Sequence, residues 1–372
     1  MSLQLPIHFE GNNHITEIFL NEILNSLLNY PIFIVKMSIT LRDISKALNI
    51  SVSTVSRALT DSHEIGEETK QKVLAYAREH HYVPNRMARS LKVGKTRSIG
   101  VVICSIDNNF VAQMLDGIDQ ICTENGYQII IMQSKESYEQ EQACINLLHA
   151  SGVDGIMISP SYQTADFSHL KELQSQGFPV VLFDRISEKM TAHKIAANNL
   201  SGAYQATTHL ISNGYTRIAH LNSNATLTTT AERFEGYKKA LEDHGIIYRE
   251  ELVAFCDTAQ QIDQNVAEAM EQLLKQQPQA IFTATDLLST KVLAYLMEHK
   301  FTVPKDIALI GFSNSDLAAV LNPSLSTVRQ PSRQIGELAA QTLISLIKGK
   351  DIGPEETILL DTELQIRKSS GS

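Results

Sequence analysis

Residues 49–59 read NISVSTVSRAL, and this stretch joins a helical period to an unusual number of hydroxyl side chains. Apolar residues recur at helical spacing along one side, namely Val52, Val55, Ala58 and Leu59. The other side carries serines, a threonine and Arg57. Hydroxyl groups weaken the interior of a helix because they compete for backbone hydrogen bonds. Such a helix suits a partner that accepts hydrogen bonds, such as DNA phosphates. The alternative is a short amphipathic surface helix.

The flanking sequence predicts a small three-helix unit. The first helix is expected over Leu41–Leu48 with Thr40 as its N-cap, followed by a tight turn at Asn49, since Asn tolerates left-handed backbone. Ser51 is expected to cap the second helix. A third helix is expected over residues 67–80, with acidic residues in its first turn, as the helix dipole favours. Pro84 ends the unit.

From Ser98 the pattern changes to apolar runs that alternate with helical stretches. Four runs form a first series, at 99–104, 127–132, 155–159 and 179–184. Five form a second, at 194–197, 217–221, 252–256, 280–284 and 307–312, closed by a helix over 331–348. Buried strands that alternate with helices indicate parallel sheets covered on both faces. We therefore expect an α/β protein with two doubly wound lobes and a ligand cleft at the carboxyl ends of the strands.

Charge is unevenly distributed along the 372 residues. The chain has a net charge of −9, but residues 38–97 hold 11 Lys and Arg against 6 Asp and Glu, a net charge of +5. Residues 1–37 carry −2 and residues 98–372 carry −12. A basic segment joined to an acidic body predicts a polyanionic partner for the basic segment alone.

Other classes of protein find little support in the sequence. The four cysteines form no CxxC pair and are expected to be reduced core thiols. No phosphate-binding, nucleophile-elbow or metal-ligand pattern occurs, so we expect no enzyme, cofactor or metal site. No signal peptide and no apolar run of 18 residues is present. We therefore expect a cytoplasmic protein and no membrane contact.

Residues 1–37 precede the basic segment and allow two interpretations. Apolar residues fall at helical spacing between Ile15 and Leu28, which is typical of a helix that docks on a partner. Alternatively, Met37 is the natural start and the extension is not native. We favour the second interpretation because a recognisable module begins directly after Met37.

Residues 38–97 resemble the DNA-binding headpiece of the LacI/GalR (lactose-repressor) family. The runs that carry the resemblance are TLRDI, SVSTVSRAL and YVPNRMARSL, and similarity continues through VDGIMI, VVLFDR, RFEGYKKAL and VPKDIALIGF to about residue 368. It implies a helix-turn-helix headpiece over 38–84, a hinge helix and linker over 85–97, and a core over 98–372 like periplasmic binding proteins. It further implies a regulator, expected to be a repressor, that binds a palindromic operator as a homodimer under control of a small effector.

The resemblance also assigns DNA-contacting residues. In the second helix they are Ser51, Val52, Ser53, Thr54, Ser56 and Arg57, and in the hinge helix Asn85, Arg86, Ala88, Arg89 and Leu91. Val52 and Ser53 would reach base edges in the major groove. Arg57 would pair with guanine or, alternatively, contact a phosphate. Leu91 would insert between base pairs in the minor groove, unless it packs on the headpiece or core.

Effector contacts are implied for Asn109, Phe110, Arg185, Asn199, Arg233, Asp286 and Ser313. Each could instead form a cap or an inter-strand hydrogen bond. Family effectors are most often sugars or purines, and they act as inducers or corepressors. Ser313 and Asn198 stand where many relatives carry Asp, so we expect this cleft to tolerate a sugar acid or sugar phosphate better than most. The family usually has Gly at the positions of Asn49 and His81.

Three rival functions are weighed against this one. A transport binding protein would need a signal peptide and no headpiece. An enzyme would need a nucleophile and base, and no such set is visible in the sequence. A DNA-binding protein without an effector would have a cleft that binds nothing. The last eleven residues, TELQIRKSSGS, contain no leucine heptad, so a dimer is expected rather than a tetramer held by a coiled coil.

Overall fold

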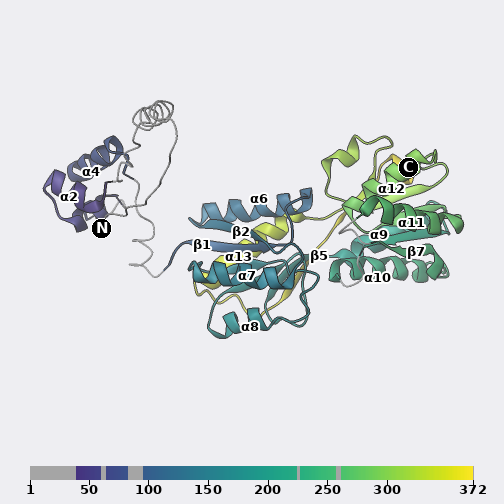
Figure 1. Cartoon of the computed structure of the whole chain (residues 1–372), viewed down its shortest axis with the longest axis horizontal. Helices are drawn as coiled ribbons and strands as arrows, with labels where there is room; N and C mark the ends of the chain where they lie inside the picture. Colours follow the sequence, from purple (N-terminus) through teal and green to yellow (C-terminus); the bar gives the residue numbers. More distant parts are fainter. Residues whose placement is uncertain (1–38, 60–63, 83–94, 224–226, 257–260, 372) are drawn as a thin grey trace, which may run out of the picture. The chain divides into compact units, whose positions relative to one another are not determined.

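The computed structural model describes residues 39–59, 64–82, 95–223, 227–256 and 261–371 (Figure 1). The chain divides into two compact units, residues 1–85 and residues 86–372. The N-terminal extension, and with it the alternative of a docking helix, lies outside the described residues. So does the expected hinge helix with Asn85, Arg86, Ala88, Arg89 and Leu91.

The first unit contains the three expected helices, α2 (Leu41–Leu48), α3 (Val52–Leu59) and α4 (Glu67–Glu79). Their buried faces meet in one small apolar core formed by Ile44, Val55, Ala58, Val73 and Ala77. Each helix contributes one or two of these side chains. Helices this short are marginal alone, so this shared core is what holds the unit together.

Local hydrogen bonds fix the ends of these helices. Thr40 and Asp43 form a capping box at the start of α2, with the Asp43 amide donating to Thr40 Oγ1 at 3.3 Å. Asn49 has φ 52° and so makes the left-handed turn between α2 and α3. Ser51 Oγ accepts from the Thr54 amide at 3.0 Å and caps α3. His81 also has left-handed backbone, with φ 49°, which explains why Gly suits both this position and that of Asn49.

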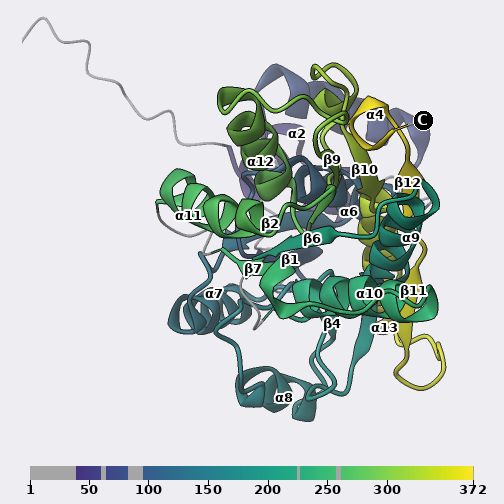
Figure 2. The ribbon, with the colours of Figure 1, turned by 90° about the vertical axis from the view of Figure 1, so that its right-hand side faces the viewer.

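The second unit contains two six-stranded sheets (Figures 1 and 2). The first lobe is built on the order β11-β5-β4-β3-β1-β2, and all its neighbouring strands are parallel. Its strands are β1 (Ser98–Ile103), β2 (Gln128–Gln133), β3 (Ile156–Ile158), β4 (Val180–Phe183), β5 (His193–Ala197) and β11 (Thr357–Leu360). Helices α6 (Asn109–Glu124) and α13 (Ser332–Ile347) cover one face, and α7 (Tyr138–Ala150) and α8 (Ser168–Ser175) cover the other.

The second lobe repeats this arrangement in the order β12-β10-β9-β8-β6-β7, with only the β10–β12 pair antiparallel. Its strands are β6 (Ile218–Asn222), β7 (Val253–Phe255), β8 (Ala280–Thr283), β9 (Ala308–Phe312), β10 (Ser326–Arg329) and β12 (Glu363–Gln365). Helices α9 (Asn199–Ser212) and α10 (Thr228–Asp243) cover one face, and α11 (Ile262–Lys275) and α12 (Asp286–Glu298) cover the other. Short 3-10 turns lie at Glu250–Leu252, Asp316–Ala319 and Lys368–Ser370.

Two elements belong to a different lobe from the one expected. The strand at 194–197, β5, pairs with β4 in the first sheet, and α13 packs on α6 in the first lobe. The chain therefore crosses between lobes three times, after β5, after β10 and between β11 and β12. The alternation of apolar runs and helices fixes the type of each element but not the sheet that it joins. The strands β10, β11 and β12 were also not expected. β11 and β12 are partly exposed, and β10 is buried but its sequence STVR contains a single apolar residue, so none gives a long apolar run.

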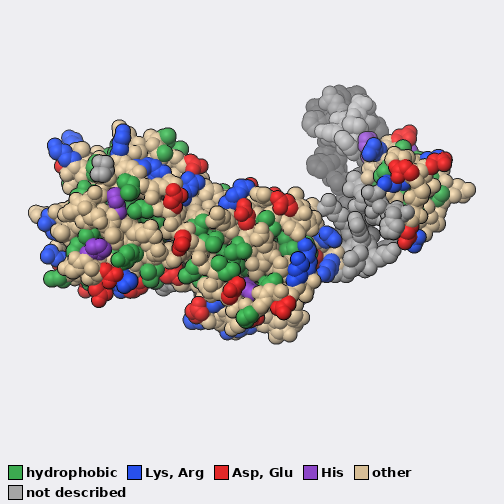
Figure 3. Space-filling view, turned by 180° about the vertical axis from the view of Figure 1, so that it is seen from behind, with side chains coloured by type: hydrophobic (Ala, Val, Ile, Leu, Met, Phe, Trp, Pro, Cys, Tyr) green, Lys and Arg blue, Asp and Glu red, His purple; other side chains and the backbone are tan. Residues whose placement is uncertain are grey.

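Both faces of each sheet are packed, as the apolar runs predict. In β1, Ile99, Val101 and Ile103 join the cluster under α6 and α13, whereas Val102 joins the cluster under α7 and α8. All four cysteines are buried thiols. The outer surfaces of the core helices carry charged side chains of both signs, interspersed on the face drawn in Figure 3. Among the described residues, no helix is long and apolar enough to cross a membrane.

Candidate functional site

Helix α3 presents most of its polar side chains to solvent. Ser51, Val52, Ser53 and Arg57 are exposed, Thr54 and Ser56 are half-buried, and Val55 and Ala58 lie in the core. Val52 differs from the first expectation that it shares the buried side, because its side chain is 40% exposed. It opens the helix, and side chains on a helix lean toward the N-terminus, so Val52 points past the edge of the small core. An exposed apolar group beside hydroxyls is suited to contact the edges of bases.

Arg57 forms an ion pair on the surface of the headpiece. Its Nη1 lies 3.2 Å from Glu64 Oε2, and both side chains are more than half exposed. Exposed pairs of this kind contribute at most about 1 kcal/mol, so a guanine edge or a phosphate can displace Glu64. The hydroxyl of Ser51 lies 2.7 Å from Ser53 Oγ and 2.8 Å from Thr54 Oγ1. Helix α3 therefore offers a cluster of hydroxyls at its N-terminal end and an exposed cation, Arg57, in its last turn.

A cleft of about 960 Å³ lies in the second unit, at the carboxyl ends of the strands of both sheets. In each lobe the strand order reverses beside the first strand, β1 in one and β6 in the other. Ligands of open α/β sheets bind at such reversal points. Six of the seven expected effector contacts line this cleft, namely Asn109, Phe110, Arg185, Arg233, Asp286 and Ser313. Its volume suits a mono- or disaccharide-sized ligand.

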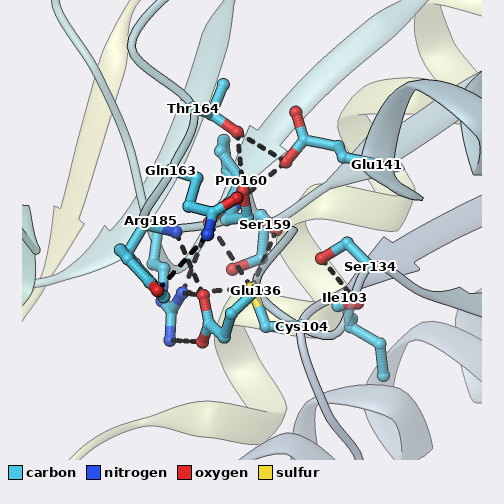
Figure 4. Close-up of polar contacts among 12 residues, drawn as sticks. Ile103, Cys104, Ser134, Glu136, Glu141, Ser159, Pro160, Gln163, Thr164 and Arg185 are labelled. Carbon is cyan, nitrogen blue, oxygen red and sulfur yellow. Dashed lines mark hydrogen bonds and ion pairs between the residues drawn. The ribbon is translucent and has the colours of Figure 1, made fainter. Parts of the chain in front are cut away.

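The wall from the first lobe is organised around Arg185 (Figure 4). Glu136 accepts two hydrogen bonds from this guanidinium, each 2.8 Å long, at Nη1 and Nη2. The Nη1 group also lies 3.0 Å from Cys104 Sγ. Burial raises the pKa of the Cys104 thiol to about 12, so the group stays protonated. Burial alone would raise the pKa of Glu136, but hydrogen bonds from Arg185 and its charge outweigh that effect, and the pKa is lowered.

Arg233 forms the corresponding wall in the second lobe. Its Nε and Nη2 donate to Asn199 Oδ1 at 3.0 and 2.8 Å, and Nη1 donates to the Ala284 carbonyl at 2.7 Å. The guanidinium carbon lies 4.0 Å from the centroid of the Phe312 ring. Burial lowers the pKa of Arg233 to about 10, which still leaves it charged at neutral pH. Asn199 does not line the cleft, contrary to expectation: it is 2% exposed and holds Arg233 from behind.

The remaining polar groups lower the positive charge of the cleft. Ser313 donates a short hydrogen bond to Asp286, so the position where relatives carry Asp still faces a carboxylate. Asp184 accepts from Ser159 Oγ at 3.0 Å, and burial raises its pKa. Charged lining residues are Lys135, Arg185 and Arg233 against Asp107, Glu136, Asp184 and Asp286. With Arg185 already paired, this geometry does not favour the acidic ligand suggested by Ser313 and Asn198.

Glu136 and Asp184 were not among the expected contacts, although Asp184 ends the apolar run at 179–184 and Glu136 comes four residues after the run at 127–132. The sequence signal that could have identified both residues is their position at or shortly after the carboxyl end of a predicted strand. Among the described residues, no three or more His, Cys, Asp or Glu side chains are grouped so that they could hold a metal ion.

Comparison with known proteins agrees with both units. Residues 40–85 match the family described as bacterial regulatory proteins, lacI family, and residues 207–370 match the periplasmic binding protein-like domain. The HTH-type transcriptional repressor PurR of Vibrio campbellii is 32% identical over 316 residues, covering 84% of this chain and 93% of that protein. The structure of the transcriptional regulator CelR–cellobiose complex superposes with a TM-score of 0.67 at 26% identity, covering 89% and 99% of the two chains. The lac repressor dimer bound to operator and the anti-inducer ONPF shares the fold, with a TM-score of 0.79 at 22% identity and 90% and 99% coverage.

Proposed function

Because the chain belongs to the LacI family of bacterial regulatory proteins, we propose that it is a transcriptional repressor that binds a palindromic operator as a homodimer and is controlled by a sugar in its cleft. Its relatives are repressors and not enzymes. A two-fold dimer would present two copies of α3, and symmetric half-sites follow from that symmetry. Binding chromosomal DNA places the protein in the cytoplasm.

One observation carries the DNA-binding part of this proposal. Helix α3 leaves Ser51, Val52, Ser53 and Arg57 exposed while Val55 and Ala58 anchor it to the headpiece core. A helix fixed in this way can enter the major groove with its N-terminal turn foremost. Arg57 can fork onto guanine, and the hydroxyls of Ser51 and Thr54 can bind phosphates. The expected hinge-helix contacts, with Leu91 as the wedge, remain part of the proposal.

The cleft supports an uncharged, hydroxyl-rich effector. Arg185 and Asp286 supply donors and acceptors, and Phe110 and Tyr162 supply apolar surface. The carboxylates of Glu136, Asp184 and Asp286 already line the cleft, and they would repel an anionic ligand. The relative solved with cellobiose agrees with a neutral sugar, and we propose that class in preference to sugar acids or phosphates.

Operator selection from a random DNA library, followed by fluorescence anisotropy, tests the DNA-binding proposal. The wild-type chain should enrich a two-fold symmetric sequence. The change Arg57→Ala should weaken binding to that sequence by about 1 to 3 kcal/mol and relax specificity at one base pair of each half-site. Arg78→Ala, which removes an exposed cation from α4, is the matched control and should weaken binding far less. Enrichment of no symmetric site, or equal losses in both variants, would contradict the proposal.

A further inference from the structure

Glu136 occupies a strained position in the loop between β2 and α7. Lys135 and Glu136 have φ values of 51° and 62°, so two consecutive non-glycine residues adopt left-handed backbone. Such backbone is strained for a residue with a side chain, and it persists only where its surroundings hold it. Here the Lys135 amide donates to the Cys104 carbonyl at 3.0 Å, and the Ser134 amide donates to the Ile103 carbonyl at 2.8 Å. The loop is therefore fastened to the end of β1.

This backbone places the Glu136 carboxylate against Arg185, where it accepts hydrogen bonds from three N–H donors. Nη1 and Nη2 of Arg185 each donate to one of its oxygens at 2.8 Å, and the Tyr162 amide donates to Oε2 at 3.0 Å. Residues that follow β1, β2, β3 and β4 thus meet at one point on the wall of the cleft (Figure 4). Glu136 therefore occupies one of the two pairs of parallel donors by which a guanidinium forks onto a carboxylate or phosphate, and it neutralises the charge of Arg185.

The rest of the guanidinium remains available for a neutral ligand. Arg185 has five N–H donors. Glu136 takes one from each terminal nitrogen, and Cys104 Sγ lies 3.0 Å from Nη1. The Nε–H and the second Nη2–H have no hydrogen-bond partner among the described residues. These two neighbouring, nearly parallel donors can bind two adjacent hydroxyls of a polyol, and they could equally fork onto a carboxylate. Discrimination between the two ligands therefore depends on charge, and the Arg185–Glu136 pair carries no net charge.

We propose that Glu136 is a specificity-determining residue that makes the cleft select uncharged sugars over sugar acids and sugar phosphates. It does so by neutralising the charge of Arg185 and by placing a negative charge beside the remaining donors, where it repels a second anion. This inference rests on the proposed function only for the identity of the natural ligand. Discrimination against anions is a property of the Arg185–Glu136 ion pair, so it can be measured with probe anions even when the natural ligand is not known.

The test compares the wild-type chain with Glu136→Gln, which removes the charge and preserves the shape. Glu136→Asn is a second variant, because Asn tolerates left-handed backbone better than Gln. Glu139→Gln removes an exposed carboxylate three residues away that does not line the cleft, and it is the matched control. Calorimetry and thermal shift at pH 7.5 would use glucose, cellobiose, glucuronate, glucose 6-phosphate and inorganic phosphate as probes.

The expected result is a gain of at least tenfold in affinity for the anionic probes in Glu136→Gln or Glu136→Asn. The control should show no gain, and adding Arg185→Gln to Glu136→Gln should abolish it. If folded Glu136→Gln and Glu136→Asn bind all anionic probes no better than the wild type, the proposal is overturned. If the variants gain affinity for anions but the chain binds neither glucose nor cellobiose, the role of Glu136 is supported and the proposed sugar effector is rejected. If a neutral sugar binds but the variants show no gain for anions, the proposed sugar effector is supported and the role of Glu136 in specificity is rejected.

Discussion

Lowering the pH from 8 to 5 should destabilise the second lobe through His220. This residue lies in β6 with no exposed surface. Its ring centroid is 4.8 to 5.7 Å from those of Phe234, Tyr237 and Phe282. Nδ1–H donates to the Phe282 carbonyl at 3.0 Å, and Nε2 has no hydrogen-bond partner among the described residues. Burial lowers the pKa of His220 from 6.5 to about 3, because an imidazolium here would lose its hydration.

The sign follows from which state binds the proton. Between pH 6.5 and pH 3 the unfolded chain protonates this histidine and the folded chain does not, so stability falls as the pH falls through 6.5. Each pH unit below the unfolded pKa costs about 1.4 kcal/mol. His220 alone should therefore remove about 2 kcal/mol between pH 8 and pH 5.

Urea unfolding of the wild type and of His220→Phe at pH 8 and pH 5 isolates this contribution. The variant keeps an aromatic ring in the stack and lacks the titrating group. It should lose about 1 kcal/mol at pH 8, for the missing hydrogen bond, but it should lose about 2 kcal/mol less than the wild type on acidification. Contributions of other titrating groups cancel in the comparison. If the free energy of unfolding of the two proteins depends equally on pH, His220 is not the group that destabilises the folded chain in acid.

Three further outcomes follow from the described contacts. Asn199→Ala leaves Nε and Nη2 of the buried Arg233 without their acceptor, so thermal or urea unfolding should show a loss of about 2 to 4 kcal/mol; a loss below 0.5 kcal/mol would contradict this. Gln113 Oε1 accepts hydrogen bonds from Ser332 Oγ at 2.6 Å and from Asn314 Nδ2 at 3.0 Å, and the second of these joins α6 to the end of β9. Gln113→Ala removes this acceptor. Amide exchange at residues 313–315 should increase, and unchanged exchange would argue against this link between the lobes. Cys104, with its pKa raised to about 12 by burial, should react with iodoacetamide at pH 8 on the order of 10³-fold more slowly than a free cysteine, as mass spectrometry can measure.

Local features of the fold follow closely from the sequence. Periodicity and capping residues predict α2, α3, α4 and α13 to within about two residues, because the burial of one face and the cap at Thr40 or Ser51 act over a few positions. The choice of sheet for β5 and α13 is different in kind. It depends on how the chain crosses between lobes, and an apolar run reads the same in either sheet.

The site shows the same division between residue type and placement. Arg185 and Arg233 were expected at the cleft, and both line it. Their partners were not predictable, because Glu136 and Asn199 are 49 and 34 positions distant. These partners decide the chemistry, since one neutralises Arg185 and the other fixes Arg233. Val52 likewise shares the apolar period of α3 but is exposed, because its place at the end of the helix outweighs its place in the period.

Control by an effector requires that sugar binding in the cleft and operator binding by α3 change each other's affinity. Reciprocal linkage measures this coupling. Once a sugar that binds the cleft and a selected operator are in hand, the operator affinity would be measured with and without saturating sugar, and the sugar affinity with and without operator. Repression controlled by an effector predicts the same change in both affinities, typically about 5- to 150-fold. Two affinities that are each unaffected by the other ligand would contradict the account.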